Sequence, residues 1–299
     1  MPARPALLDW LLLAALVFAW GSSFVMSKIA LQAIDASWIA AARLVVGASV
    51  VLAYAAIRRR LPSTDGKSLA IYTWLGFIGN AAPFLVITWG MHYISSGVAG
   101  LLMGTIPLII VVMAHFFLPN EKLTVARAAA FMLGFAGVLV LIGPREIYNL
   151  SLTGDELIGQ LAVIAGCMMY GVNSITAKML PQADFVSRSA GVLVCAAMLA
   201  VVMALLSAPF ALTNAPASAL WATVGLGILP TGFATLVWFK AMTRNGPTFV
   251  SMSNYLVPVY AVLFGALLLG EKIGWNVLAA MALILAGIFV STLRRQPSQ

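Results

Sequence analysis

Residues 20–29 read WGSSFVMSKI, and residues 170–179 read YGVNSITAKM. In each stretch an aromatic residue precedes a glycine, two small polar residues follow, and a lysine comes eight positions after the aromatic residue. The two stretches lie 150 positions apart in a chain of 299 residues. The second half of the chain therefore repeats a pattern of the first half.

The composition places the chain in a lipid bilayer. Hydrophobic residues make up 62% of the chain, charged residues make up 9%, and the mean hydropathy is +1.02. A soluble domain carries about 25% charged residues, so this chain could not cover a water-facing surface. The net charge of +8 does not indicate nucleic-acid binding, because the basic residues lie mostly in short gaps between apolar runs, which is typical of membrane topology.

Apolar runs of roughly 17–25 residues are long enough to cross a bilayer as helices. By that rule the chain is an all-α membrane protein with ten transmembrane helices. The predicted spans lie near residues 7–27, 35–57, 69–90, 96–118, 123–142, 156–178, 185–208, 218–241, 248–269 and 274–293. The first run resembles a signal peptide, but its echo at residue 170 indicates a retained helix.

Lysine and arginine residues are distributed unevenly between the two predicted sides. Thirteen of the 17 lie at the termini or in the second, fourth, sixth and eighth loops, and three lie on the opposite side. Short loops rich in Lys and Arg stay in the cytoplasm. We therefore expect a multi-pass membrane protein with both termini cytoplasmic.

The repeat extends beyond the opening motif. Residues 107–122 read PLIIVVMAHFFLPNEK and residues 258–272 read PVYAVLFGALLLGEK, and sixteen residues after each Glu come Gly137 and Gly287. These matches predict two five-helix repeats, residues 7–142 and 153–293. Because five is odd, the second repeat enters the membrane from the other side. Inverted repeats of this kind are typical of transporters that work by alternating access.

These residues resemble a known family. WGSSF at the end of the first span, the arginine of ARLVVGASVV at residues 42–51, and the doubled pattern of proline, Glu-Lys and glycine are similar to the EamA-type family of the drug/metabolite transporter superfamily. Within that superfamily the chain is most similar to the YddG-type exporters of aromatic and other amino acids. The resemblance implies two five-helix bundles around a central cavity that opens alternately to each side, in a bacterial inner (plasma) membrane.

Proline residues occupy matching positions in the two predicted repeats. Pro107 and Pro258 lie about halfway through the fourth and ninth spans, and Pro83 and Pro230 lie in the third and eighth. A proline inside a helix removes one backbone hydrogen bond and crowds the carbonyl group four residues earlier. Each kink is either a static packing feature or a hinge, and the matched positions favour hinges.

Polar and aromatic side chains recur on single faces of several spans, and at membrane depth such faces point at protein or water. We therefore expect a central substrate-binding cavity. Its predicted lining residues are Trp20, Ser22, Ser23, Asn80, Phe84, Met103, Tyr170, Asn173, Thr231, Phe233, Ser251, Asn254 and Tyr255. For any one of them helix packing is an equal explanation, so the prediction depends on their convergence.

Charged groups at membrane depth are scarce. All nine acidic residues lie at or beyond the end of a span, which argues against proton-coupled drug export. Arg43 lies about 12 Å along its helix from Asp35. We expect a structural role for it, in which it either reaches the membrane interface or pairs with Asp35 or another loop carboxylate. Lys28 and Lys178 are either interfacial anchors or ligands for a substrate carboxylate. The cavity is thus expected to carry no fixed charge and to prefer ligands that are neutral overall, such as zwitterions.

Together these features predict a transporter that exports amino acids, aromatic and other neutral ones, by alternating access, as facilitated diffusion or uniport. The alternative is an exporter of other small metabolites or lipophilic drugs. The chain has no GxSG, HExxH or Walker A motif, so we do not expect an enzyme. We expect no cofactor, no metal, no nucleic-acid partner, and a monomer or loose homodimer in the bilayer. Cys167 and Cys195 are expected to be buried thiols.

Overall fold

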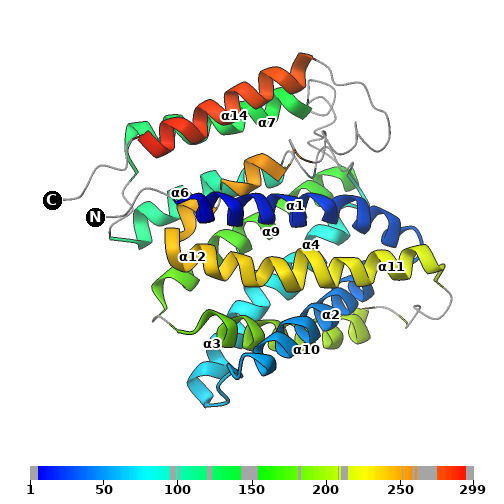
Figure 1. Cartoon of the computed structure of the whole chain (residues 1–299). Helices are drawn as coiled ribbons and strands as arrows, with labels where there is room; N and C mark the ends of the chain where they lie inside the picture. Colours follow the sequence, from blue (N-terminus) through cyan, green and yellow to red (C-terminus); the bar gives the residue numbers. More distant parts are fainter. Residues whose placement is uncertain are drawn as a thin grey trace.

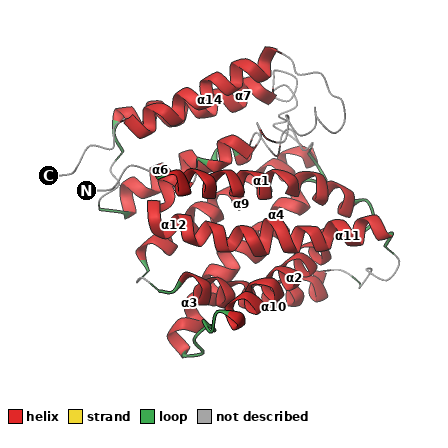
Figure 2. Ribbon diagram, in the orientation of Figure 1, coloured by secondary structure: helices red, strands yellow, loops and turns green. Residues whose placement is uncertain are grey.

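The computed structural model describes residues 6–94, 99, 102–119, 123–142, 154–180, 183–207, 209, 215–250, 252–257, 260 and 275–293. Figures 1 and 2 show a bundle of helices, and the described residues contain no strand. The all-helical class predicted from the sequence is therefore confirmed for this part of the chain.

The described helices follow the predicted spans closely. In the first half they are α1 (Leu7–Leu31), α2 (Ala36–Ile57), α3 (Gly66–Gly76), the π-helix η1 (Phe77–Ala81), α4 (Ala82–Gly90), α6 (Ile106–Phe117) and α7 (Val125–Ile142). In the second half they are α9 (Gly154–Met179), α10 (Phe185–Ser207), α11 (Ala217–Leu226), the π-helix η3 (Gly227–Phe233), α12 (Ala234–Val250) and α14 (Trp275–Leu293).

Six helical segments in the described residues are long and apolar enough to cross a membrane. They match the first, second, third, sixth, seventh and eighth predicted spans. Shorter apolar helices at Ile106–Phe117, Ala128–Gly137 and Leu278–Gly287 fall within three more. Most of the ninth predicted span lies outside the described residues, so ten spans remain a prediction.

The third and eighth spans are each interrupted by a π-helix at an equivalent place. In the third span η1 is followed directly by α4, whose second residue is Pro83. In the eighth span η3 contains Pro230. A proline has no N–H to donate to the carbonyl four residues earlier, so the backbone shifts locally to the wider π pattern, which occurs frequently at functional sites.

The position of Pro107 within its helix differs from the one predicted. Instead of lying in the middle of a continuous helix, it is the second residue of α6, which begins after a turn at Gly104 and Thr105. A proline is well tolerated there, because the first turn of a helix has no partner for its N–H groups. Pro258, its predicted counterpart, lies outside the described residues.

Helices of the two halves pack against one another in reciprocal pairs. α1 contacts α12 and α9 contacts α4, while α2 contacts η3 and α10 contacts η1. α2 and α10 contact each other, and so do α7 and α14, which run side by side at the top of Figure 1. Gly137 and Gly287, singled out in the sequence, lie in this last contact.

The α7–α14 contact brings backbone against backbone. A Cβ atom added at Gly137 would lie 3.0 Å from the carbonyl oxygen of Ala280, and one added at Gly287 would lie 2.6 Å from that of Ala130. Since lipid supplies no hydrophobic drive for helix association, membrane helices depend on such close approach at small residues. These glycines are therefore required for packing.

Replacing Gly287 by alanine should weaken the α7–α14 contact. The new Cβ would clash with backbone atoms of Ala130 and Gly134 that cannot rotate away, and overpacking of this kind costs about 1–3 kcal/mol. We expect a lower midpoint of thermal unfolding for the purified protein in detergent. Gly66→Ala is the matched control, because a Cβ there meets nothing within 4 Å. Equal midpoints for the two variants would contradict the described packing.

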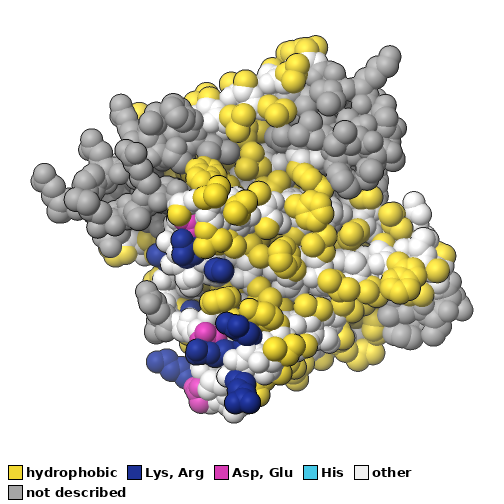
Figure 3. Space-filling model, viewed as in Figure 1, with side chains coloured by type: hydrophobic (Ala, Val, Ile, Leu, Met, Phe, Trp, Pro, Cys, Tyr) yellow, Lys and Arg dark blue, Asp and Glu magenta, His cyan; other side chains and the backbone are white. Residues whose placement is uncertain are grey.

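Charged side chains gather at one end of the bundle. In Figure 3 the dark-blue Lys and Arg side chains lie at the left, at the end where α1 begins, whereas yellow apolar side chains cover much of the remaining described surface. Arg60 lies 3.9 Å from Asp184, and the hydroxyl of Ser187 donates to the carbonyl of Leu61, so the second and sixth predicted loops meet. These loops were predicted to share one side of the membrane.

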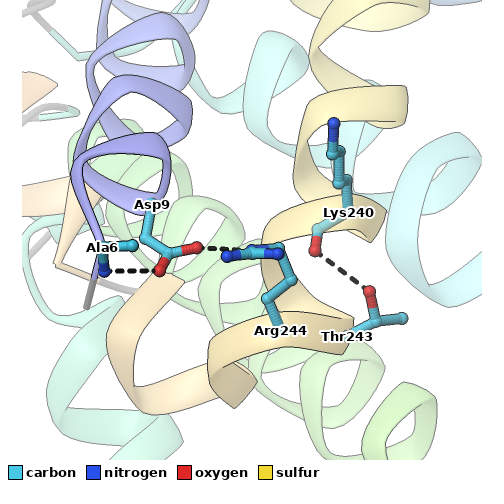
Figure 4. A network of polar contacts seen from close by, with 5 residues as sticks. All are labelled: Ala6, Asp9, Lys240, Thr243 and Arg244. Carbon is cyan, nitrogen blue, oxygen red and sulfur yellow. Dashed lines mark hydrogen bonds and ion pairs between the residues drawn. The ribbon is translucent and has the colours of Figure 1, made fainter. Parts of the chain in front are cut away.

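An ion pair ties the two halves together at the same end (Figure 4). Arg244 of α12 donates from Nε to Oδ1 of Asp9 at 2.6 Å, and Asp9 also accepts from the backbone N–H of Ala6 at 2.8 Å. Asp9 is buried and Arg244 is partly exposed. Just beyond Arg244, Gly246 interrupts α12 with φ of 78°, a backbone conformation that glycine adopts without strain.

Exchanging the charges of Asp9 and Arg244 tests whether their ion pair stabilises the protein. Asp9→Arg alone or Arg244→Asp alone places like charges face to face, so each should lower the midpoint of thermal unfolding. The double variant restores opposite charges and should recover part of that loss, although the bond to Ala6 is lost. A double variant less stable than both single variants would show that the pair contributes nothing.

Candidate functional site

A cavity of about 190 Å³ lies between the helices of the two halves. Its walls come from α1, α2, η1, α4, α6, α9, α10, η3, α12 and the segment 252–257. The lining residues are Trp20, Ser23, Ser27, Arg43, Gly79, Asn80, Phe84, Ile87, Thr88, Met91, Met103, Ile106, Ile110, Tyr170, Asn173, Ser174, Val192, Pro230, Thr235, Trp238, Phe239, Met242, Val250, Asn254 and Val257.

Eight of the residues predicted from the sequence line this cavity. They are Trp20, Ser23, Asn80, Phe84, Met103, Tyr170, Asn173 and Asn254, and the predicted hinge residue Pro230 joins them. The convergence that single residues could not establish is therefore present in the structure.

Four other predicted lining residues do not line the cavity. Ser22 and Thr231 are buried, and their hydroxyls donate to the backbone carbonyls of Ala19 and Leu226, at 2.8 and 2.7 Å. Phe233 is 42% exposed on the outer surface. It is the last residue of the π-helix η3, where the 3.6-residue spacing does not hold.

Tyr255 is the fourth residue outside the cavity wall. Its side chain is buried, its hydroxyl donates to the carbonyl of Phe131 at 3.0 Å, and its ring lies against Gly134 of α7. Asn254 faces the cavity, and the next residue along a helix points about 100° away. Ser251 lies outside the described residues, and Pro83 and Pro107 are buried away from the cavity wall.

Much of the cavity wall formed by α12 was not predicted from the sequence. Thr235, Trp238, Phe239 and Met242 all line the cavity, and they follow the i, i+3, i+4, i+7 spacing of one helical face. That spacing would have found them. Ser27 on α1, Thr88 on α4 and Ser174 on α9 are polar lining residues that were also not predicted.

Arg43 is the most consequential residue that the predictions placed elsewhere. It neither reaches the interface nor pairs with Asp35, whose carboxylate instead caps α2 by accepting from the backbone N–H and the hydroxyl of Ser37. Arg43 is 8% exposed and lines the cavity. The expectation of a cavity without fixed charge is therefore wrong.

Two contacts hold the guanidinium of Arg43. Its Nε donates to Oγ1 of Thr231 at 3.1 Å, and its Cζ lies 3.9 Å from the centroid of the Phe84 ring, a cation–π distance. Among the described lining residues Arg43 is the only charged one, and none is an acid. The positive charge thus has no acidic partner among the lining residues that the structure describes.

The uncharged polar groups of the cavity differ in whether they already form hydrogen bonds. The hydroxyls of Ser23 and Ser174 donate to carbonyls of their own helices, those of Trp20 and Tyr170. The side-chain amides of Asn80 and Asn173 form no hydrogen bond within the described residues, and Asn173 lies against Gly79, where any Cβ would clash with it. These amides are available to a ligand.

Lining positions recur between the two halves at the spacing of the sequence repeat. Trp20 and Tyr170 lie 150 positions apart, and Met103 and Asn254 lie 151 apart. Further pairs at 150 or 151 positions are Ser23 and Asn173, Gly79 and Pro230, Phe84 and Thr235, Ile87 and Trp238, Thr88 and Phe239, Met91 and Met242, and Ile106 and Val257.

The described part of the chain holds no cluster of three or more His, Cys, Asp or Glu side chains that could bind a metal ion.

Comparison with known proteins identifies the class. The chain belongs to the EamA-like transporter family, which matches residues 8–143 and 157–293. The chain is therefore a membrane transporter of the EamA type, as the sequence patterns predicted.

Individual relatives are also transporters. The chain is 28% identical to the uncharacterized transporter YoaV of Bacillus subtilis, over 91% of this chain and 92% of that protein. It is 29% identical to a "probable terminal-alkyne amino-acid exporter" of Streptantibioticus cattleyicolor, over 94% and 92%. It is 31% identical to the aromatic amino acid exporter YddG of Ancylobacter novellus, over 65% and 66%. One crystal structure shares the fold, with a TM-score of 0.79 and 23% identity over 95% of this chain and 96% of that one.

Proposed function

We propose that this protein exports amino acids across the bacterial inner membrane by alternating access, as a uniporter. The observation that carries the proposal is the cavity between the two halves, lined from equivalent positions by aromatic, Met and amide side chains. Two relatives are named as exporters of amino acids, which agrees with this substrate class.

The alternating-access mechanism is supported by the reciprocal packing of the two halves. If residues 7–142 and 153–293 are inverted repeats, each contact of one half should recur with the partners exchanged. The pairs α1–α12 and α9–α4 do so, as do α2–η3 and α10–η1. A transporter built in this way exposes one central site to each side in turn, by rocking one repeat against the other.

The proposed hinges are the interrupted helices beside the cavity. Pro83 follows η1 and Pro230 lies within η3, and both π-helices contribute residues to the cavity wall. Broken helices are tolerated at membrane depth where protein surrounds the freed backbone groups. We include Pro107, which lies in the first turn of α6, and its counterpart in the sequence repeat, Pro258, in this set.

The lining suits amino-acid side chains of different shapes. Trp20, Phe84 and Trp238 offer aromatic surface, and the flexible side chains of Met91, Met103 and Met242 adapt to varied apolar groups. The amides of Asn80 and Asn173 can bind the polar end of a substrate. The absence of acids among the described lining residues favours movement without proton exchange.

Purified protein in liposomes tests the proposal directly. Liposomes loaded with labelled L-phenylalanine or L-leucine, with equal pH and sodium on both sides, should release the label down its own gradient faster than protein-free liposomes. Release only when a pH step is imposed would contradict uniport. Movement of nucleobases or lipophilic dyes but of no amino acid would contradict the substrate class.

A matched pair of variants tests whether the substrate passes through the cavity. Ser23→Trp places a large ring in the cavity itself, so it should lower the release rate at least ten-fold. Val25→Trp, two residues further along α1, changes a side chain that is 56% exposed on the outer surface and should leave the rate unchanged. Equal rates for both variants would show that substrate passes elsewhere.

A further inference from the structure

We infer that Arg43 is the carboxylate-binding residue of the cavity, and that the protein therefore selects its substrates by their carboxylate rather than by their amine. The inference rests on the proposed function and adds to it the chemical group that is recognised. It starts from the placement of one buried guanidinium among uncharged groups.

The geometry leaves the anion-binding side of the guanidinium available. Nε is used by Thr231, and the guanidinium carbon lies over the Phe84 ring. The donors of both terminal nitrogens have no hydrogen-bond acceptor within the described residues. A planar guanidinium held at its Nε and against an aromatic ring presents those terminal donors in a fixed orientation, which matches the two oxygens of a carboxylate.

A purely structural role explains this placement poorly. A buried charge is strongly unfavourable unless it is paired and hydrogen-bonded, and no acid lies in the described wall. The equivalent lining position in the second half, 149 positions on, is Val192, which belongs to the corresponding helix α10. The second half packs without a charge at this position, so the architecture itself does not require one.

The cavity treats the two ends of an amino acid unequally. A substrate carboxylate would meet a full positive charge on Arg43, whereas a substrate ammonium group would meet only amide or hydroxyl oxygens and aromatic faces. An ion pair in a cavity of low dielectric constant is much stronger than in water. Loss of the carboxylate should therefore weaken binding far more than loss of the amine.

Three ligands with the same aromatic ring separate these contributions. Binding of L-phenylalanine, 3-phenylpropanoate and phenethylamine to the purified protein in detergent can be measured by calorimetry. We expect the wild type to bind L-phenylalanine and 3-phenylpropanoate, and to bind phenethylamine at least ten-fold more weakly than 3-phenylpropanoate. Binding of phenethylamine as tight as that of 3-phenylpropanoate would overturn the inference, and this arm needs no variant to fold.

Variants at Arg43 and at its hydrogen-bond partner Thr231 test whether the Arg43 guanidinium causes the preference for a carboxylate. Arg43→Gln should weaken the binding of 3-phenylpropanoate at least ten-fold without weakening the binding of phenethylamine. Arg43→Lys should retain part of the preference for the carboxylate because it keeps the positive charge. Thr231→Val removes the Nε acceptor but keeps the charge, so it should preserve the preference. If Arg43→Gln and Thr231→Val weakened all three ligands equally, Arg43 would be a structural residue.

The two proposals fail in different ways. A wild type that transports L-phenylalanine but shows no preference for the carboxylate would leave the exporter function standing and overturn the role of Arg43. A wild type that binds carboxylates through Arg43 but moves no amino acid in liposomes would overturn the exporter function and leave the role of Arg43 standing.

Discussion

The hydroxyl of Thr231 connects the broken backbone of the eighth span to the charge in the cavity. Pro230 has no N–H to offer the carbonyl of Leu226, and the Thr231 hydroxyl donates to that carbonyl at 2.7 Å instead. The same oxygen accepts from Nε of Arg43 at 3.1 Å. In a bilayer, where water cannot satisfy backbone groups, one side chain thus stabilises a π-helix and orients a guanidinium.

Close packing of small residues makes this arrangement possible. A Cβ at Gly47 of α2 would lie 2.7 Å from the Thr231 side chain, and a Cβ at Gly227 of η3 would lie 2.9 Å from the carbonyl oxygen of Arg43. The two glycines let α2 approach η3 closely enough for Arg43 to reach across. The charge in the cavity therefore depends on the absence of two side chains on neighbouring helices.

Sequence periodicity predicted the spans and much of the cavity because most of these helices keep a 3.6-residue turn. Trp20, Ser23, Tyr170 and Asn173 were placed correctly on the wall, since they lie on uninterrupted helices. Phe233 was not, because a proline predicts a disturbed helix but not whether it widens to a π pattern. The side of α2 that faces the cavity depends on how α2 packs against η3, so no local pattern revealed that Arg43 lines it.

The central claim is that one cavity opens to each side of the membrane in turn. Ser27→Cys places a thiol in the cavity wall, in a chain whose Cys167 and Cys195 are replaced by alanine. A membrane-impermeant thiol reagent is then added to right-side-out and to inside-out vesicles. We expect the thiol to be labelled from both sides, and L-phenylalanine to slow the labelling in each case. Labelling from one side only, with or without the amino acid, would contradict it.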